Sequence, residues 1–212
     1  MSDRYDTSDH PETRFEPGSG GRVLANKLGV TDPEEMDAIE LDLLVQLHDA
    51  LIDEVTADQG FSSTDLCEWH RRWLGNVYPW AGRYRTLNMA KGEHLFAASA
   101  RVPRLIDVLD REVLSAHTPC EHMPEERLAA AIATVHVELI LIHPFREGNG
   151  RLSRLLANLM ALQAGRPNLD FGPWDRDKPA YFAAIQAGLD DPGPMMELVT
   201  RALRASPAGD PP

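Results

Sequence analysis

Residues 143–154, with the sequence HPFREGNGRLSR, gather side chains of three chemical kinds in one short segment. His143 is suited to accept a proton from a hydroxyl near neutral pH. Glu147 offers the hard carboxylate oxygens that Mg²⁺ prefers. Arg151 and Arg154 stand three residues apart, so on a helix they project from neighbouring positions, and two guanidinium groups suit a polyphosphate.

The backbone of the same segment is expected to bind an anion. Pro144 disfavours the α conformation at His143, so a helix that precedes it should end there. Gly148 and Gly150 permit the unusual backbone angles of a tight turn, and a second helix should begin near Asn149 or Gly150. Its free N–H groups would form an anion-binding concavity beside the base, the carboxylate and the arginines. These are the parts that phosphoryl or nucleotidyl transfer requires.

Apolar residues at helical spacing predict the elements that position this segment. Those between 128 and 142 predict a central helix, and those between 152 and 162 predict the next, closed by Gly165 and Pro167. Further helices are predicted over 33–51, capped by Thr31 or Asp32, over 66–73, capped by Ser62, Ser63 or Thr64, and over 102–113, 181–189 and 195–203.

The stretch 82–97 departs from the helical pattern. It contains a Lys91-Gly92 turn signal between short, partly alternating segments, which predicts a β-hairpin. We therefore expect a mostly α fold with one hairpin, in a single domain over 23–205. Residues 1–22 are expected to form a disordered or irregular arm, and 206–212 a flexible tail.

Composition narrows the class of protein. The chain has 212 residues, and its 21 Lys plus Arg against 33 Asp plus Glu give a net charge of −12. Such a balance argues against nucleic acid or an anionic membrane as a partner. No apolar run could span a bilayer, no secretory signal is present, and Cys67 and Cys120 offer neither a disulfide framework nor a metal quartet. A cytoplasmic protein is expected.

The segment 143–154 resembles the signature of the Fic family, His-x-Phe-x-(Asp/Glu)-Gly-Asn-Gly-Arg-x-x-Arg, at every specified position. Residues 77–82 look like the family's segment before its hairpin, and 82–97 look like the hairpin itself, called the flap. Residues 24–30 are similar to the start of bacterial Fic proteins of the toxin type. The resemblance implies a Fic-type helical domain with the flap beside the active-site loop.

The resemblance also implies an activity. Family members with this motif transfer AMP from ATP to a Tyr, Ser or Thr hydroxyl of a target protein, with Mg²⁺ as cofactor. Carried over by position, His143 would be the general base and Glu147 the Mg²⁺ ligand. Gly148, Asn149 and Gly150 would form the anion hole, with Asn149 near the α-phosphate, while Arg151 and Arg154 would hold the β- and γ-phosphates and Phe145 would anchor the loop. The 82–97 hairpin would dock the target, and Lys91 and Gly92 would contact the nucleotide.

Regulation is expected to come from a partner. Many relatives carry an inhibitory helix with the motif (Ser/Thr)-x-x-x-Glu-(Gly/Asn), whose Glu pairs with the second motif arginine, here Arg154. This sequence lacks that motif. The resemblance therefore implies a separate small antitoxin that supplies the inhibitory Glu in trans against the helices of the N-terminal half.

Two alternative functions stay open. One is a Fic-fold transferase that uses another nucleotide or acts as a protein kinase, although the kinase branch typically has Lys where this chain has Gly150. The other is a catalytically silent nucleotide-binding module. The presence of both His143 and Glu147 favours an enzyme.

Overall fold

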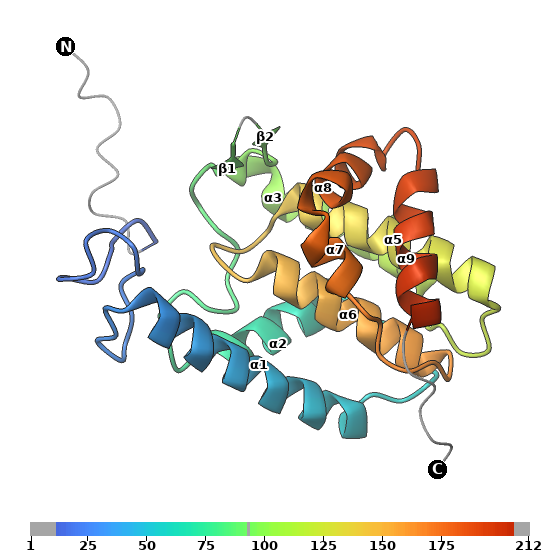
Figure 1. Ribbon diagram of the computed structural model, residues 1–212, viewed down its shortest axis with the longest axis horizontal. Helices are drawn as coiled ribbons and strands as arrows, with labels where there is room; N and C mark the ends of the chain where they lie inside the picture. Colours follow the sequence, from blue (N-terminus) through green and yellow to red (C-terminus); the bar gives the residue numbers. More distant parts are fainter. Residues whose placement is uncertain (1–11, 93, 206–212) are drawn as a thin grey trace.

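A computed structural model describes residues 12–92 and 94–205, which form a helical fold with a small hairpin (Figure 1). The elements in chain order are α1 (Pro33–Glu54), α2 (Ser63–Leu74), β1 (Ala90–Lys91), β2 (His94–Leu95), the 3₁₀ turn η1 (Ser99–Arg101), α3 (Val102–Val108), the π-helical η2 (Leu109–Leu114), α4 (Ser115–His117), α5 (Glu125–Ile142), α6 (Asn149–Gln163), α7 (Gly172–Arg176), α8 (Lys178–Ala187) and α9 (Gly193–Ala205). The expected mostly α fold with one hairpin is confirmed.

The starts of the first two helices use the predicted caps. The Asp32 carboxylate accepts the backbone N–H groups of Glu34 and Glu35, and Pro33 takes the first helical position. At α2, the Ser62 hydroxyl accepts the N–H of Asp65 while the Asp65 carboxylate accepts the N–H of Ser62. This reciprocal capping box selects Ser62 from the three candidates.

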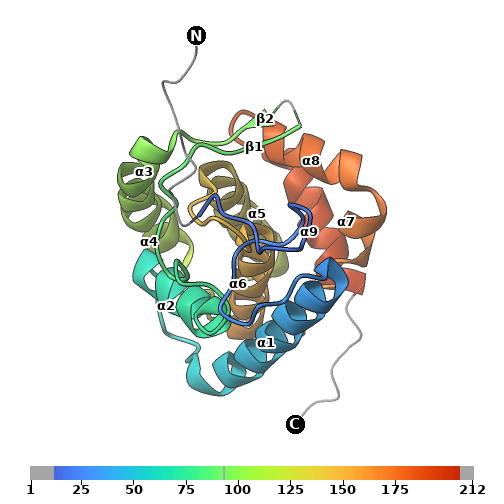
Figure 2. The same cartoon turned by 90° about the vertical axis from the view of Figure 1, so that its left-hand side faces the viewer.

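Helix α5 forms the centre of the core because it is apolar around most of its circumference. It packs most extensively against α6 and α9. The view in Figure 2 places α5 and α6 in the middle, with α2 to α4 on one side and α7 to α9 on the other. No described helix is both long and apolar enough to cross a membrane.

Two elements differ from the sequence prediction. Residues 102–117 form one continuous helical run whose middle, η2, is π-helical, which apolar spacing alone does not reveal. Helix α7 was not predicted, because its five residues are too few to show a periodic pattern. It nevertheless positions Trp174 and Asp175 at the functional site described below.

The hairpin pairs over fewer residues than the predicted stretch 82–97. Its ladder joins Ala90 to Leu95 and Lys91 to His94, with β1 and β2 antiparallel. Residues 82–89 reach this ladder in an irregular conformation. We keep the name flap for the whole of 82–97.

The described part of the predicted N-terminal arm, from Glu12 on, is irregular and packs against the domain. Phe15 forms an isolated bridge with Leu24. Glu12 is buried: its carboxylate accepts the N–H of Thr86 over 3.1 Å, and its carbonyl accepts Nε–H of Arg146 over 2.7 Å. The expectations for residues 1–11 and 206–212 lie outside the described residues, and the domain limits stay a prediction.

A buried arginine fixes the flap to the end of α5. Arg85 is 2% exposed, and its guanidinium donates to the carbonyls of Ile142 and His143 on one side and of Leu87 and Ala97 on the other, over 2.5–3.2 Å. The charge lies where the helix dipole is negative. Arg85 therefore satisfies four carbonyl oxygens that would otherwise lose their hydrogen bonds on burial.

We expect Arg85→Met to lower the free energy of unfolding by about 3 kcal/mol, because the carbonyls at both ends lose their donor. Urea denaturation followed by circular dichroism measures the loss. Arg83→Met is the matched control, since Arg83 is exposed and donates to the carbonyl of Pro79 at the surface, and we expect it to change stability by less than about 0.5 kcal/mol. Equal stability of the two variants would contradict this role for Arg85.

Candidate active site

The segment singled out by its chemistry forms a tight loop between α5 and α6, residues 143–148, which we call the motif loop. Helix α5 ends at Ile142, and His143 adopts a left-handed conformation with φ 52° and ψ 60°. The predicted stop before Pro144 is thus confirmed. A non-glycine residue in this region is uncommon and is typical of sites where surrounding contacts hold the backbone in place.

The Asn149 side chain closes the motif loop. Its Oδ1 accepts the N–H of Phe145 over 2.9 Å, and its Nδ2 donates to the carbonyl of Phe145 over 2.8 Å. Phe145 itself is fully buried, as expected for an anchor. The side-chain amide of Asn149 is thus already bonded to the loop backbone. Asn149 can therefore offer an anion its backbone N–H, at the start of α6.

A second histidine, His70, holds the motif loop from the side of α2. The ring of His70 stacks on Phe145 at 4.1 Å, its Nδ1 accepts the N–H of Gly82, and its Nε2 lies 3.1 Å from the carbonyl of Glu147. Since Nδ1 is an acceptor, Nε2 carries the hydrogen and donates to Glu147. Burial lowers the pKa of His70 to about 4, so this imidazole is neutral at pH 7.

His143 is held in the form that a general base requires. Its Nδ1 lies 3.2 Å from the carbonyl of Ile140, which can only accept, so Nδ1 carries the hydrogen and Nε2 keeps a lone pair. Phe96 of the flap stacks on the ring at 3.7 Å. Burial, aided by the charges of Arg85 and Lys91, lowers the pKa of His143 to about 4. The proton-accepting form therefore dominates at neutral pH.

The two motif arginines are paired with different acids. Arg151 donates to Glu40 of α1 over 2.5 Å and lies over the ring of Trp73, with Glu40 only 3% exposed. Arg154 donates through both terminal nitrogens to Asp175 of α7, over 3.0 and 2.7 Å. The two guanidinium groups thus rest against α1 and α7 respectively.

Most of the predicted site residues line one cleft of about 420 Å³. They are Lys91, His143, Glu147, Gly148, Asn149, Gly150, Arg151 and Arg154. Gly92 lies in the turn of the flap with φ 60° and is not among the described residues that line this cleft. The structure therefore brings together the motif and Lys91 but leaves Gly92 outside.

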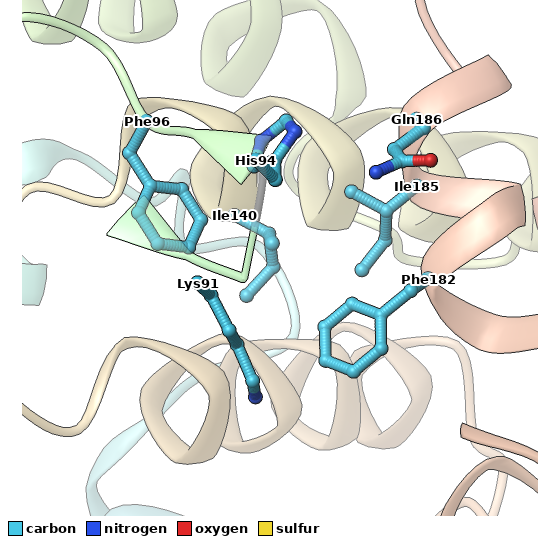
Figure 3. A pocket seen from close by; sticks show the side chains of 7 residues that line it. All are labelled: Lys91, His94, Phe96, Ile140, Phe182, Ile185 and Gln186. Carbon is cyan, nitrogen blue, oxygen red and sulfur yellow. The ribbon is translucent and has the colours of Figure 1, made fainter. Parts of the chain in front are cut away.

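An apolar cavity of about 300 Å³ adjoins the cleft and shares Lys91, Phe96, Ile140 and Phe182 with it. Figure 3 shows side chains of the flap and of α8 on opposite sides of this cavity, with Ile140 of α5 between them. Lys91 Nζ lies 4.4 Å from the ring centroid of Phe182. The cleft and the cavity together, which we call the combined space, are polar and cationic at one end and apolar at the other.

A buried polar chain ties the helices around this space together. His136 of α5 is 1% exposed, with Nδ1 2.7 Å from the Ser153 hydroxyl of α6 and Nε2 2.8 Å from the Tyr181 hydroxyl of α8. Burial lowers the pKa of His136 to about 3, so the network is uncharged at pH 7. Fully satisfied networks of this kind specify one arrangement of their helices.

Comparison with known proteins decides the family. The sequence model described as the Fic/DOC family matches residues 60–161. Residues 60–161 of the chain belong to the Fic/DOC family. Protein adenylyltransferase fic-1 of Caenorhabditis briggsae is 36% identical over 151 residues, which cover 68% of this chain and 28% of that protein. The chain thus spans under a third of this relative's length.

Two other comparisons concern a bacterial relative and a solved structure. Probable protein adenylyltransferase y4lH of Sinorhizobium fredii is 28% identical over 146 residues, covering 69% of this chain and 74% of that protein. Among solved structures, BepC from Bartonella tribocorum with bound AMPPNP superposes with a TM-score of 0.70 at 21% identity, over 91% of this chain and 97% of that chain. The latter likeness establishes the fold.

The Fic/DOC motif in this chain fits Mg²⁺ with a small donor set. Glu147 Oε1 accepts the N–H of Gly148 over 2.9 Å, and its side chain is 44% exposed at the cleft. No group of three His, Cys, Asp or Glu residues that could hold a metal occurs in the described ranges. One accessible carboxylate suits an ion that takes its other oxygens from substrate phosphates and water.

The two glycines of the Fic/DOC motif have different roles. Gly148 has φ 81°, and a Cβ there would lie 2.6 Å from the Trp73 ring. Gly150 lies inside α6 with no positive φ, and a Cβ there would meet nothing within 4 Å. Both glycines permit unusual backbone angles, but only Gly148 adopts one, because α6 has already begun at Asn149, as the sequence predicted. Gly150 instead leaves open space above the helix N-terminus.

We expect Gly148→Ala to lower the free energy of unfolding by about 2–3 kcal/mol, through backbone strain and the clash with Trp73. Gly150→Ala should leave stability unchanged or raise it by about 0.5–1 kcal/mol, because alanine favours the helix. Urea denaturation of both variants tests the difference. A comparable loss in both variants would contradict a left-handed Gly148 beside a helical Gly150.

Proposed function

We propose that this chain is a protein adenylyltransferase that transfers AMP from ATP to a Tyr, Ser or Thr hydroxyl of a target protein. The observation that carries the proposal is His143, whose Nδ1 carries the hydrogen so that Nε2 keeps a lone pair, in the cleft that also contains the N-terminus of α6 and both motif arginines. The names of the Caenorhabditis and Sinorhizobium relatives support the same reaction.

In the proposed reaction, His143 Nε2 takes the proton of the target hydroxyl as its oxygen bonds to the α-phosphorus. The bond from that phosphorus to the bridging oxygen breaks, and pyrophosphate leaves with the electron pair. The N–H groups at the start of α6 would stabilise the charge on the α-phosphate, and Arg151 and Arg154 would stabilise the charge on the leaving group. Mg²⁺, held by Glu147 and the phosphates, would supply further positive charge.

The shape of the combined space supports one orientation of the nucleotide. Its phosphates would lie at the cationic end, beside α6. The base would enter the apolar cavity between Phe96 and Phe182, where aromatic faces can pack against any base. The proposal is in keeping with AMPPNP bound to the BepC protein, which shares the fold.

We propose two protein partners as well, a target protein and an antitoxin. For the target docked along the 82–97 hairpin, the support is Leu95 of β2, an apolar side chain left 78% exposed. For an antitoxin helix, the support is an apolar groove of about 330 Å³ along α1, which contains the exposed Leu41 and Val45 and reaches Arg151 and Arg154. An inhibitory Glu supplied there would meet Arg154. A toxin of this kind would act in the cytoplasm.

Incubation of the chain with Mg²⁺ and each nucleoside triphosphate, with and without host lysate as a source of target, tests the activity by intact mass. We expect a gain of one AMP mass from ATP, in the chain or in a target, and a loss of at least about 10²-fold in rate with His143→Ala. A phosphate gain instead would indicate the kinase alternative, and gain of another nucleotide would change the substrate. Nucleotide binding without any transfer would favour the silent module.

The low pKa of His143 predicts the pH dependence of transfer. The free base persists until the pH falls through about 4, so kcat/KM should stay flat from pH 8 to about 5.5 and fall only below that. Rates measured at saturating Mg²⁺, corrected for the pH dependence of ATP binding to His143→Ala, test this. A loss of activity with a midpoint near 6.5 would contradict the buried, neutral imidazole.

A further inference from the structure

The guanidinium of Arg154 is already occupied by a carboxylate of the same chain. Nη1 donates to Asp175 Oδ2 over 3.0 Å and Nη2 donates to Asp175 Oδ1 over 2.7 Å. This two-pronged arrangement is the one that an arginine offers to two oxygens of a phosphate. Asp175 also lines the cleft. A ligand phosphate that pairs with Arg154 in this way must first displace Asp175.

We propose that Asp175 is an exchangeable substitute for phosphate on Arg154, and that it sets the affinity of the cleft for ligands with a β- or γ-phosphate. The identity of the ligand rests on the function proposed above. The carboxylate would leave Arg154 when ATP binds and return when pyrophosphate departs. Asp175 would thereby weaken polyphosphate binding and favour release of the leaving group.

The pair of Arg154 with Asp175 is more open to solvent at its acid than the pair of Arg151 with Glu40, as an exchangeable carboxylate requires. The side chains of Arg154 and Asp175 are 26% and 54% exposed, so water and salt screen their attraction. Glu40, which pairs with Arg151, is 3% exposed and also accepts a hydrogen bond from the Tyr78 hydroxyl over 2.6 Å. The pair at Arg151 is therefore a fixed support, and the pair at Arg154 is open to exchange.

The surroundings keep Arg154 in place when the carboxylate leaves. The rings of Phe171, Trp174 and Tyr181 lie 5.2–5.9 Å from its guanidinium carbon. Trp174 is buried and its Nε1 donates to the carbonyl of Leu198, which pins α7 to α9. Exchange therefore needs only a rotation of the Asp175 side chain, with no movement of α7.

A second cation can receive the displaced carboxylate. Lys178, three residues beyond Asp175, lines the same cleft and contributes, after Arg154, to lowering the pKa of Asp175. Asp175 therefore stays ionised whether it faces Arg154 or Lys178. On exchange, the Asp175 carboxylate would move from Arg154 towards Lys178, while a ligand phosphate takes its place on Arg154.

Isothermal titration with ATP, pyrophosphate and AMP in the presence of Mg²⁺ tests the proposal. All variants carry His143→Ala, so that no transfer consumes the nucleotide. We expect Asp175→Asn to lower the Kd for ATP and for pyrophosphate about tenfold and to change the Kd for AMP less than about twofold, because AMP has no phosphate for Arg154. Asp175→Ala should act in the same direction, and thermal unfolding confirms that both variants fold.

Two controls distinguish this exchange from a general loss of negative charge. In the Arg154→Ala variant, adding Asp175→Asn should shift the Kd for ATP less than about twofold. With Arg154 intact, Asp190→Asn, which removes an exposed acid outside the cleft, should also shift it less than about twofold. A gain in ATP affinity in either control equal to that of Asp175→Asn would overturn the proposal. Weaker ATP binding to Asp175→Asn would also overturn it, since Asp175 would then position Arg154 for the ligand. If no variant binds any nucleotide, the proposed function itself fails.

Discussion

The relative position of the end of α5 and the flap depends on the hydrogen bonds of one buried guanidinium, that of Arg85. The last carbonyls of a helix have no partners inside the helix, and at the end of α5 Arg85 supplies the partners of Ile142 and His143. The same group donates to Leu87 and Ala97 of the flap. It therefore sets both the position of His143 and that of Phe96, which stacks on it. Its charge also disfavours a proton on His143.

Three neutral histidines show how this interior uses imidazole. His70, His136 and His143 all have pKa values lowered by burial, and each has at least one ring nitrogen within hydrogen-bond distance of a neighbouring group. His70 and His136 use both nitrogens in contacts with neighbouring elements and are structural. Among the residues that the structure describes, His143 is hydrogen-bonded through Nδ1, and it lines the cleft. The proposed base thus differs from the two structural histidines in keeping a lone pair on Nε2.

Local patterns were enough to predict the longer helices but not α7, to place Asp32 and Ser62 among the candidate caps, and to predict the hairpin turn and the end of α5 before Pro144. Each of these depends on residues within a few positions of one another. Arg85, His70, Glu40 and Asp175 were missed because each acts on a group far away in the chain, such as the pairing of Glu40 with Arg151 111 residues later. Spacing along the chain carries no signal for such contacts, and the neighbours of Arg85 in the sequence, Tyr84 and Thr86, do not mark it as buried.

The hydrogen-bonded chain from Tyr181 through His136 to Ser153 has a consequence for ligand size. Ser153 stands next to Arg154 on α6, and Tyr181 stands next to Phe182 on α8, so the hydrogen-bonded chain couples the position of Arg154 to the wall of the apolar cavity. Sliding of either helix along its axis would break a buried hydrogen bond. The hydrogen bonds therefore oppose any change in the distance between Arg154 and Phe182, and a molecule that spans both ends of the space would have to match that length.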